Sequence, residues 1–301
     1  MGFHLKEYFR NYFFKRYEIW NIGFIDTPTS QLPVDTSKNK IKWLQRESYF
    51  DYYADPFPME KDGVLYIFAE KFEWSKKKGK IVCLEFDKSK ALKAEHTVIE
   101  NETHFSYPQT FQCNGNYFLL AENYITNKLD LYEAEKFPFV WKKKCTIETG
   151  RFVDSTILFH ENIWWIFYSV QDEKVNHNLY IMYSDNLDGK WIQHPVNPVK
   201  TNIRSARSAG NVIKHNSSLY RPAQNCTKTY GGSIVLNKIT TLTKEKYEEQ
   251  EESELMPDKT DFCDGLHTIN TAGDLWVVDG KKYIYKFKGL KQLLNQLIGK
   301  N

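Results

Sequence analysis

The feature that most constrains the fold of this chain is a degenerate internal repeat of about 50 residues. If Asp55, Tyr107, Asp154, Ser208 and His267 are taken as equivalent openings, the spacings between copies are 52, 47, 54 and 59 residues. Each copy has a small or polar opening, a short apolar strand, a tight turn and a second, strongly aromatic strand. A period near 50 with about four strands per unit is typical of a β-propeller blade.

The turns and the segments between the hairpins support this interpretation. The turn residues are types that tolerate the positive φ of tight hairpins: Asp62-Gly63, Asn114-Gly115, Glu161-Asn162 and Asn216-Ser217. Outer strands are expected at 80–86, 129–134, 179–184 and 233–239. The Lys- and Glu-rich segment 244–254 is expected to be a solvated connecting loop. Five units predict an all-β, five-bladed β-propeller over residues 19–286.

Two short extensions flank the predicted propeller. Residues 1–18 mix aromatic side chains with Lys6, Arg10, Lys15 and Arg16. They are expected to pack on the propeller as a helix or strap, or to lie on an anionic membrane surface. Residues 287–301 place Leu and Ile on one helical stripe, which predicts a short amphipathic helix that packs on the body or makes a dimer contact.

Composition narrows the class of protein. Aromatic residues make up 16% of the 301 residues, which favours strands and suits clefts that stack on sugar rings. The net charge of +3 is too small to indicate nucleic-acid binding. The five cysteines are widely spaced and lack zinc-site spacing, so free thiols in a reducing compartment are expected. No secretory signal or membrane span is recognised, so a cytoplasmic location is expected, with peripheral membrane contact through residues 1–18.

The opening residues of the repeat carry the candidate chemistry. Because the innermost strand of every propeller blade lines the central axis, Asp55, Tyr107, Asp154, Arg207 or Ser208, and His267 should converge there. Two carboxyl groups in one funnel are the basic equipment for cleaving or forming a glycosidic bond. The alternative is structural: Asp55 before proline can be a turn former, and Asp154 can be a local cap.

A second column of polar residues ends the second strands, at Glu70, Glu122, Ser169 and Gln224. Glu122 follows a very apolar strand, where a carboxyl group is costly unless it is paired or functional. A structural ion pair with Arg221 or Arg151 is the alternative for it.

Three arginines, Arg204, Arg207 and Arg221, fall within 18 positions. Such clusters suit bidentate recognition of phosphate or carboxylate. Ion pairing between blades is the alternative.

The segment ADPFPMEKDGVLYIFAE, which begins at Ala54, resembles the first blade of the five-bladed propellers of glycoside hydrolase families 43, 32 and 68. The whole chain more specifically resembles the N-terminal propeller domain of plant glucosamine inositolphosphorylceramide transferases and its stand-alone bacterial relatives. The segments that carry this resemblance are ADPFPMEKDG, HFSYPQTFQCNGNYFLLAEN, RFVDSTILF, RSARSAGNVI, LYRPAQNC and GLHTIN.

The resemblance implies roles for individual residues. Asp55 matches the base or nucleophile of the propeller hydrolases, and Asp154 matches their second Asp, which tunes pKa values or holds ring hydroxyls. Their general acid is a Glu in a later blade, where this chain has Arg207-Ser208-Ala209-Gly210. Glu122 is the best substitute acid. In the plant proteins a separate exostosin-like domain transfers the sugar, so the name alone implies no activity for the propeller.

Three functions follow as hypotheses. The first is an enzyme that transfers a sugar, for example a furanose, at its anomeric carbon during bacterial surface-polysaccharide or glycolipid synthesis. The second is a glycoside hydrolase resembling family 43, and the third is a non-catalytic glycan-binding propeller. The first implies a phosphorylated or nucleotide-sugar donor and a glycan acceptor, with no metal or other cofactor.

Asp55, Glu122 and Asp154 are the predicted catalytic residues. The predicted substrate-binding residues are Glu70, His104, Tyr107, Arg204, Arg207, Arg221, Gln224 and His267.

Overall fold

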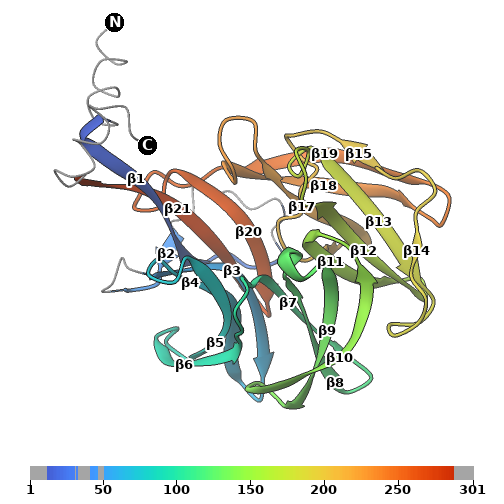
Figure 1. Ribbon diagram of the computed structural model, residues 1–301, viewed down its shortest axis with the longest axis horizontal. Coiled ribbons are helices and arrows are strands. Elements are labelled where there is room, and N and C mark those ends of the chain that lie inside the picture. Colours follow the sequence, from blue (N-terminus) through green and yellow to red (C-terminus); the bar gives the residue numbers. More distant parts are fainter. Residues whose placement is uncertain (1–11, 31, 33–40, 47–50, 288–301) are drawn as a thin grey trace, which may run out of the picture.

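The computed structural model describes residues 12–30, 32, 41–46 and 51–287. These residues form five antiparallel sheets, which follow one another around a central axis in the order of the sequence (Figure 1). The prediction of an all-β, five-bladed propeller is confirmed. Nowhere in these described ranges is there a helix with the length and apolarity needed to cross a membrane.

The first two blades are regular four-stranded sheets. Blade 1 contains β3 (Asp51–Lys61), β4 (Val64–Glu73), β5 (Lys78–Phe86) and β6 (Leu92–Ile99). Blade 2 contains β7 (Ser106–Cys113), β8 (Asn116–Glu122), β9 (Lys128–Lys136) and β10 (Val140–Thr149), with one 3-10 turn at Tyr124–Thr126.

Blades 3 and 4 deviate more from this pattern. Blade 3 contains β11 (Phe152–His160), β12 (Ile163–Val170), β13 (Asn178–Ser184) and the short β14 (Ile192–Gln193) and β15 (Lys200–Thr201). Blade 4 contains β16 (Ile213–His215), β17 (Ser218–Asn225), β18 (Ser233–Leu242) and β19 (Tyr247–Leu255). Its inner strand is therefore short, and Ser208 joins the sheet only through an isolated bridge to Ala223.

Blade 5 closes the ring with strands from both ends of the chain. Its order is β2 (Ile41–Trp43), β1 (Phe14–Ile25), β21 (Leu275–Phe287) and β20 (Gly265–Ala272). The β1–β21 pairing runs from Phe14↔Phe287 to Ile25↔Trp276. The predicted boundary at residue 18 therefore falls inside β1, because the aromatic and β-branched residues of this stretch continue the ladder. Residues 1–11 and the predicted helix after Phe287 lie outside the described part of the chain.

The repeat is visible in the backbone as well as in the sequence. Asp55, Tyr107 and Asp154 have positive φ values of 51°, 47° and 47°. Each sits in a β-bulge where the inner strand shifts register against the second strand. β20 carries the same shift between Leu266 and Ile269. A bulge kinks the strand and re-aims a side chain, so the equivalent openings point toward the axis.

The tight turns behave as predicted. Residues of the four predicted hairpins have positive φ, including Asp62 at 52°, Asn114 at 48° and Asn216 at 45°. The prediction of a loop at 244–254 is wrong, because β19 occupies most of this segment. Tyr247 is 8% exposed, whereas Glu248 and Gln250 face solvent. The charged residues mark the solvated edge of an outer strand, where charge discourages pairing with another sheet.

Candidate active site in the axial funnel

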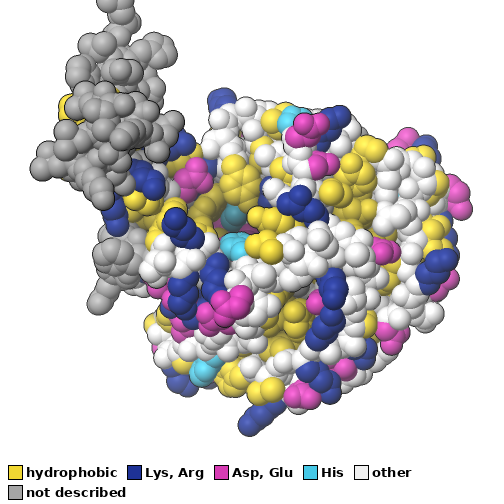
Figure 2. All heavy atoms as spheres, viewed as in Figure 1, with side chains coloured by type: hydrophobic (Ala, Val, Ile, Leu, Met, Phe, Trp, Pro, Cys, Tyr) yellow, Lys and Arg dark blue, Asp and Glu magenta, His cyan; other side chains and the backbone are white. Residues whose placement is uncertain are grey.

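The bulges bring polar side chains from different blades together at the axis. The backbone N–H of Tyr107 donates to Asp55 Oδ2 at 3.2 Å, and the backbone N–H of Asp154 donates to Glu122 Oε2 at 2.9 Å. Figure 2 shows histidine side chains near the centre of this face, among hydrophobic ones. The four carboxyl groups that meet here are 4–7% exposed: Asp55, Glu70, Glu122 and Asp154.

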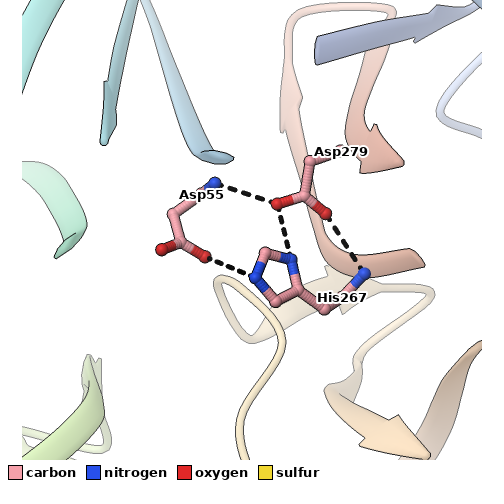
Figure 3. Close-up of side chains that lie close together, drawn as sticks. All are labelled: Asp55, His267 and Asp279. Carbon is pink, nitrogen blue, oxygen red and sulfur yellow. Dashed lines mark hydrogen bonds and ion pairs between the residues drawn. The ribbon is translucent and has the colours of Figure 1, made fainter. Parts of the chain in front are cut away.

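Asp55 is held by residues of blade 5 (Figure 3). Its Oδ1 accepts a hydrogen bond from Thr268 Oγ1 at 2.9 Å and lies 3.6 Å from His267 Nε2. The opposite nitrogen, His267 Nδ1, lies 2.6 Å from Asp279 Oδ2, which also accepts the backbone N–H of Asp55 at 2.9 Å. The Trp20 ring stacks on the His267 ring with centroids 3.9 Å apart. His267 is thus fixed between two carboxyl groups.

In these surroundings the pKa values of Asp55 and His267 are both raised. Burial raises the pKa of Asp55 to about 6; the nearby His267 opposes this, while the charges of Asp279 and Asp154 add to it. Burial alone would lower the pKa of His267, but Asp279 and Asp55 outweigh it, so that pKa is raised. Asp55 therefore exchanges its proton near neutral pH, beside an imidazole that favours its charged form.

Asp55, His267 and Asp279 offer three ligand atoms within 4.8 Å of one another, which raises the question of a metal ion. Asp279 does not fit this role. Its Oδ1 accepts the backbone N–H groups of His267 and Thr268, and its Oδ2 accepts the N–H of Asp55 and faces His267 Nδ1. With both oxygens occupied by donors, the set is reduced to one carboxylate oxygen and one imidazole nitrogen, and the three residues form a hydrogen-bonded unit instead.

Asp154 has a different environment on the other side of the funnel. Its Oδ2 accepts Arg207 Nε at 2.5 Å and Gln224 Nε2 at 2.8 Å. Arg207 also donates to Asn176 and lies over the Tyr230 ring, with 4.9 Å from its guanidinium carbon to the ring centroid. Asp154 is therefore part of a buried, charge-assisted network that fixes its orientation.

Glu70 and Glu122 occupy equivalent positions, opposite the bulges of blades 1 and 2. Burial raises both pKa values well above the ordinary range. The charge of Asp154 adds to the effect on Glu122, and Arg207 opposes it. Asp55 and Glu122 add to the effect on Glu70. Both glutamates are consequently candidates for carboxyl groups that hold a proton at neutral pH.

His104 lies beside Glu70. Its Nδ1 accepts the backbone N–H of Gly79 at 2.8 Å, and its Nε2 is 3.7 Å from Glu70 Oε1. Burial lowers the pKa of His104 to about 4, so the ring is neutral at physiological pH. Gly79 is required here, because a Cβ at this position would lie 2.5 Å from Glu70 Oε1.

Three other predicted residues have structural partners. The Tyr107 hydroxyl shares a hydrogen bond with Thr156 of β11 and accepts the backbone N–H of Gly210 at 2.7 Å, so this side chain links β7 to β11 and to the segment before β16. Arg221 is fully buried and binds both oxygens of Glu249, and Arg204 pairs with Glu251 and Glu254. Arg204 and Arg221 are therefore structural ion-pair partners, but of β19 within blade 4 and not between blades as the predicted alternative had it. Only Arg207 of the three contacts a funnel carboxyl group.

The predicted alternative for Glu122, a pair with Arg221 or Arg151, is not made. Arg221 is committed to Glu249, and Arg151 lies over the Tyr124 ring. Sequence reasoning also missed Asp279, Thr268, Trp20 and Tyr230. Asp279 carried a usable signal, because it ends the apolar run LWVVD as Glu122 ends LLAE. Nothing in the sequence marked Trp20. It lies on β1, which is distant in sequence from β21, the strand with which it pairs to close the ring.

Fold and site together define a five-bladed propeller with buried carboxyl groups at its axis. Residues 25–263 match the family model described as "Glucosamine inositolphosphorylceramide transferase 1, N-terminal". The chain belongs to this family. It is 34% identical over 259 residues to glucosamine inositolphosphorylceramide transferase 1 of Arabidopsis thaliana and 31% identical over 205 residues to that of Oryza sativa subsp. japonica. These matches cover 77% and 66% of this chain but 34% and 28% of the relatives, so it spans about a third of their length.

Solved structures confirm the architecture at low sequence identity. A family 117 glycoside hydrolase from Zobellia galactanivorans superimposes with a TM-score of 0.56 at 13% identity, covering 80% of this chain and 88% of that one. A family 43 β-xylosidase/α-arabinofuranosidase from a compost metagenome gives 0.56 at 11% identity, covering 82% and 95%. These similarities show the fold that the chain shares with propeller hydrolases.

Proposed function

We propose that this propeller is a carbohydrate-active enzyme that transfers a sugar at its anomeric carbon during glycolipid or surface-polysaccharide assembly. The observation that carries the proposal is the contrast between carboxyl groups within one buried funnel. Burial raises the pKa of Asp55 to about 6, whereas it raises the pKa of Glu122, whose Oε2 accepts the Asp154 N–H, well above the ordinary range of a carboxyl group. Carboxyl groups with separated pKa values are what acid–base chemistry at a glycosidic bond needs.

The roles follow from these environments. Asp55 takes the proton of the acceptor hydroxyl as that oxygen bonds to the anomeric carbon, or attacks that carbon itself as a nucleophile. The bond from the anomeric carbon to the leaving group breaks, and Glu122 gives its proton to the departing oxygen. Asp154 orients the sugar through its fixed carboxylate, and His267 keeps Asp55 in place and stabilises its charge.

Unpartnered polar atoms support a polar ligand in this funnel. Glu70 Oε1, Ser208 Oγ and Gln224 Oε1 are buried and have no hydrogen-bond partner among the described residues. Unsatisfied buried groups are costly, and they persist where a ligand or water completes them. Sugar hydroxyls, which both donate and accept, are groups of the right chemistry, and Arg207 adds a cation suited to a phosphorylated donor.

The name of the relatives supports a lipid-linked acceptor, and Arg207, a cation suited to a phosphorylated donor, favours transfer over hydrolysis. Transfer in bacterial surface-polysaccharide synthesis and the use of a furanose donor are the more specific forms of the proposal. Hydrolysis of an oligosaccharide is the second candidate. It is favoured by Asp55 and Asp154, which occupy the places that the resemblance to propeller hydrolases assigns to their two Asp residues.

The test is a donor screen on the full chain. Sugar phosphates, nucleotide sugars and aryl furanosides are incubated with and without a glycan or glycolipid acceptor, and products are read by mass spectrometry. Transfer predicts an acceptor-dependent glycosylated product, whereas hydrolysis predicts free sugar without acceptor. Saturable glycan binding without turnover, unaffected by Asp55→Asn, would contradict both and leave a binding propeller.

A further inference from the structure

The strand pair that closes blade 5 continues beyond the propeller. We call the paired segments 14–18 of β1 and 283–287 of β21 the terminal ribbon. In Figure 1 the start of β1 and the end of β21 project from the body of the propeller. From Asp279, at the level of the funnel, β21 runs on to Phe287, which corresponds to roughly 25 Å of strand at about 3.3 Å per residue.

The terminal ribbon stands on the side of the funnel mouth. The Tyr17 ring packs edge-on against Trp74, with centroids 5.0 Å apart. Trp74 follows β4, the strand that carries Glu70 to the funnel and ends at Glu73. The Trp74 ring also contacts Phe72 at 5.1 Å, and Phe72 lies 6.1 Å from His104 beside Glu70. A continuous line of rings therefore joins the base of the ribbon to the catalytic funnel.

The ribbon presents aromatic and basic side chains to its surroundings. Phe14 and Phe287 are 37% and 61% exposed, and Phe13, directly before the ribbon, is 37% exposed. Phe14 and Phe287 face each other across the strands with ring centroids 5.8 Å apart. Because alternate residues of a strand face opposite sides, Phe14 and Arg16 share one face and Lys15 and Tyr17 the other.

The terminal ribbon itself carries three cations, Lys15, Arg16 and Lys286, and one acid, Glu18. After Asp279 the sequence contains no Asp or Glu as far as Asn301. Within its described part, Lys281 is fully buried and donates to Thr229, and Lys282 pairs with Asp261, so Lys286 is the lysine that this strand adds to the ribbon. On the N-terminal side, Lys15 and Arg16 precede the single acid of the ribbon, Glu18. Exposed phenylalanines among clustered cations are the chemistry that binds an anionic bilayer surface, with rings in the headgroup region and cations on phosphates.

We propose that the terminal ribbon docks the funnel mouth against an anionic lipid bilayer. The ribbon then acts as a spacer, and the funnel opens toward the membrane surface, where it meets an acceptor whose sugar stands above the headgroups. Charge selects this occupant over a second copy of the chain, because the cations of two ribbons would repel each other along their open edges. Docking to the membrane does not depend on the proposed sugar transfer. Only the statement that the funnel meets an acceptor there rests on the proposed function.

The test measures binding of the full chain to vesicles by flotation. Vesicles of phosphatidylcholine alone are compared with vesicles containing 30% phosphatidylglycerol, at about 50 and 500 mM salt. Binding is expected only with the anionic lipid and is expected to fall at least tenfold at high salt, because exposed charges are screened within a few ångströms there. Phe14→Ser with Phe287→Ser, and separately Lys15→Glu with Lys286→Glu, should each reduce binding at least tenfold.

The matched control reverses two lysines on the opposite face of the propeller. Lys88→Glu, in the turn after β5, with Lys214→Glu, in the short strand β16, makes the same change in net charge away from the terminal ribbon and should leave most of the binding intact. Hydrogen exchange supplies the second measurement: anionic vesicles should protect the amides of the terminal ribbon but not the turn at 87–91. Equal loss of binding in ribbon and control variants would overturn the proposal. So would unprotected ribbon amides, or a dimer by light scattering that the ribbon variants abolish.

Discussion

Asp55 and Asp154 occupy the same position in blades 1 and 3, yet their surroundings differ. Both have φ near 50° and both sit in a bulge of the inner strand. Asp154 is bound by Arg207 and Gln224, whereas Asp55 faces His267 and lies close to the carboxyl group of Asp279. The backbone repeat therefore delivers a carboxyl group, and the neighbouring blade determines what that group can do.

The largest effect is expected from Asp55→Asn. Asparagine keeps the shape of the side chain and tolerates positive φ, so the fold should persist. Removal of the base or nucleophile should lower turnover by at least about 10²–10⁴-fold. The matched control is Asp62→Asn, the same substitution at a φ of 52° in the hairpin turn at the other end of blade 1. If Asp55→Asn turns over as fast as Asp62→Asn, then Asp55 is not the base or nucleophile.

Arg207→Met tests the Asp154 side of the comparison. It removes the cation from a buried carboxylate, and breaking a buried ion pair in this way typically costs about 3–5 kcal/mol of stability. Turnover and melting temperature should therefore fall together, unlike in Asp55→Asn. Adding Asp154→Asn should restore much of the melting temperature but no activity. Thermal unfolding of the unmodified chain, Asp55→Asn, Arg207→Met and the double variant Arg207→Met with Asp154→Asn checks this. An unchanged melting temperature in Arg207→Met would mean that the ion pair does not hold Asp154.

Leaving-group dependence sharpens the assignment of the acid. Glu122→Gln should lower turnover about 10²-fold or more on donors with a poor leaving group, but little on dinitrophenyl glycosides, whose departure needs no proton. Glu70→Gln, the equivalent change in blade 1, is the comparison. If Glu70→Gln shows the selective loss and Glu122→Gln does not, the acid is Glu70, whose Oε1 has no partner in the described structure.

The sequence was sufficient for the repeat but not for the partners of its polar residues. Turn residues such as Asn114, and the residues equivalent to Asp55 in the other copies of the repeat, could be recognised because local sequence determines the local backbone geometry. The ion pair of Arg221 with Glu249 links β17 to β19, so its choice of partner depends on strand register. Asp279 reaches Asp55 only because β1 closes the ring and places β21 next to blade 1. Such contacts are properties of the assembled propeller and leave no local pattern.

The smallest expected effect is on the pH dependence of stability, and it separates the two glutamates. A carboxyl group whose pKa is raised on folding favours the folded state at low pH, and this contribution is lost as the pH rises through the folded pKa. For Glu70, burial and the charges of Asp55 and Glu122 raise the pKa. Glu70→Gln should therefore raise the melting temperature at pH 8 by a few degrees, at about 2–4 °C per kcal/mol, and leave it unchanged at pH 4.

Glu122→Gln should give a smaller gain at pH 8, because Arg207 and the Asp154 N–H both favour the charged form of Glu122. Calorimetric scans of the three proteins from pH 4 to pH 8 check this order. The two carboxyl groups share the burial that raises their pKa values, so the difference between the variants reports what Arg207 and the bulge amide contribute. Equal gains would mean that Arg207 and the Asp154 N–H do not stabilise the charged form of Glu122. The difference between the two sides of the funnel would then concern Asp154 alone.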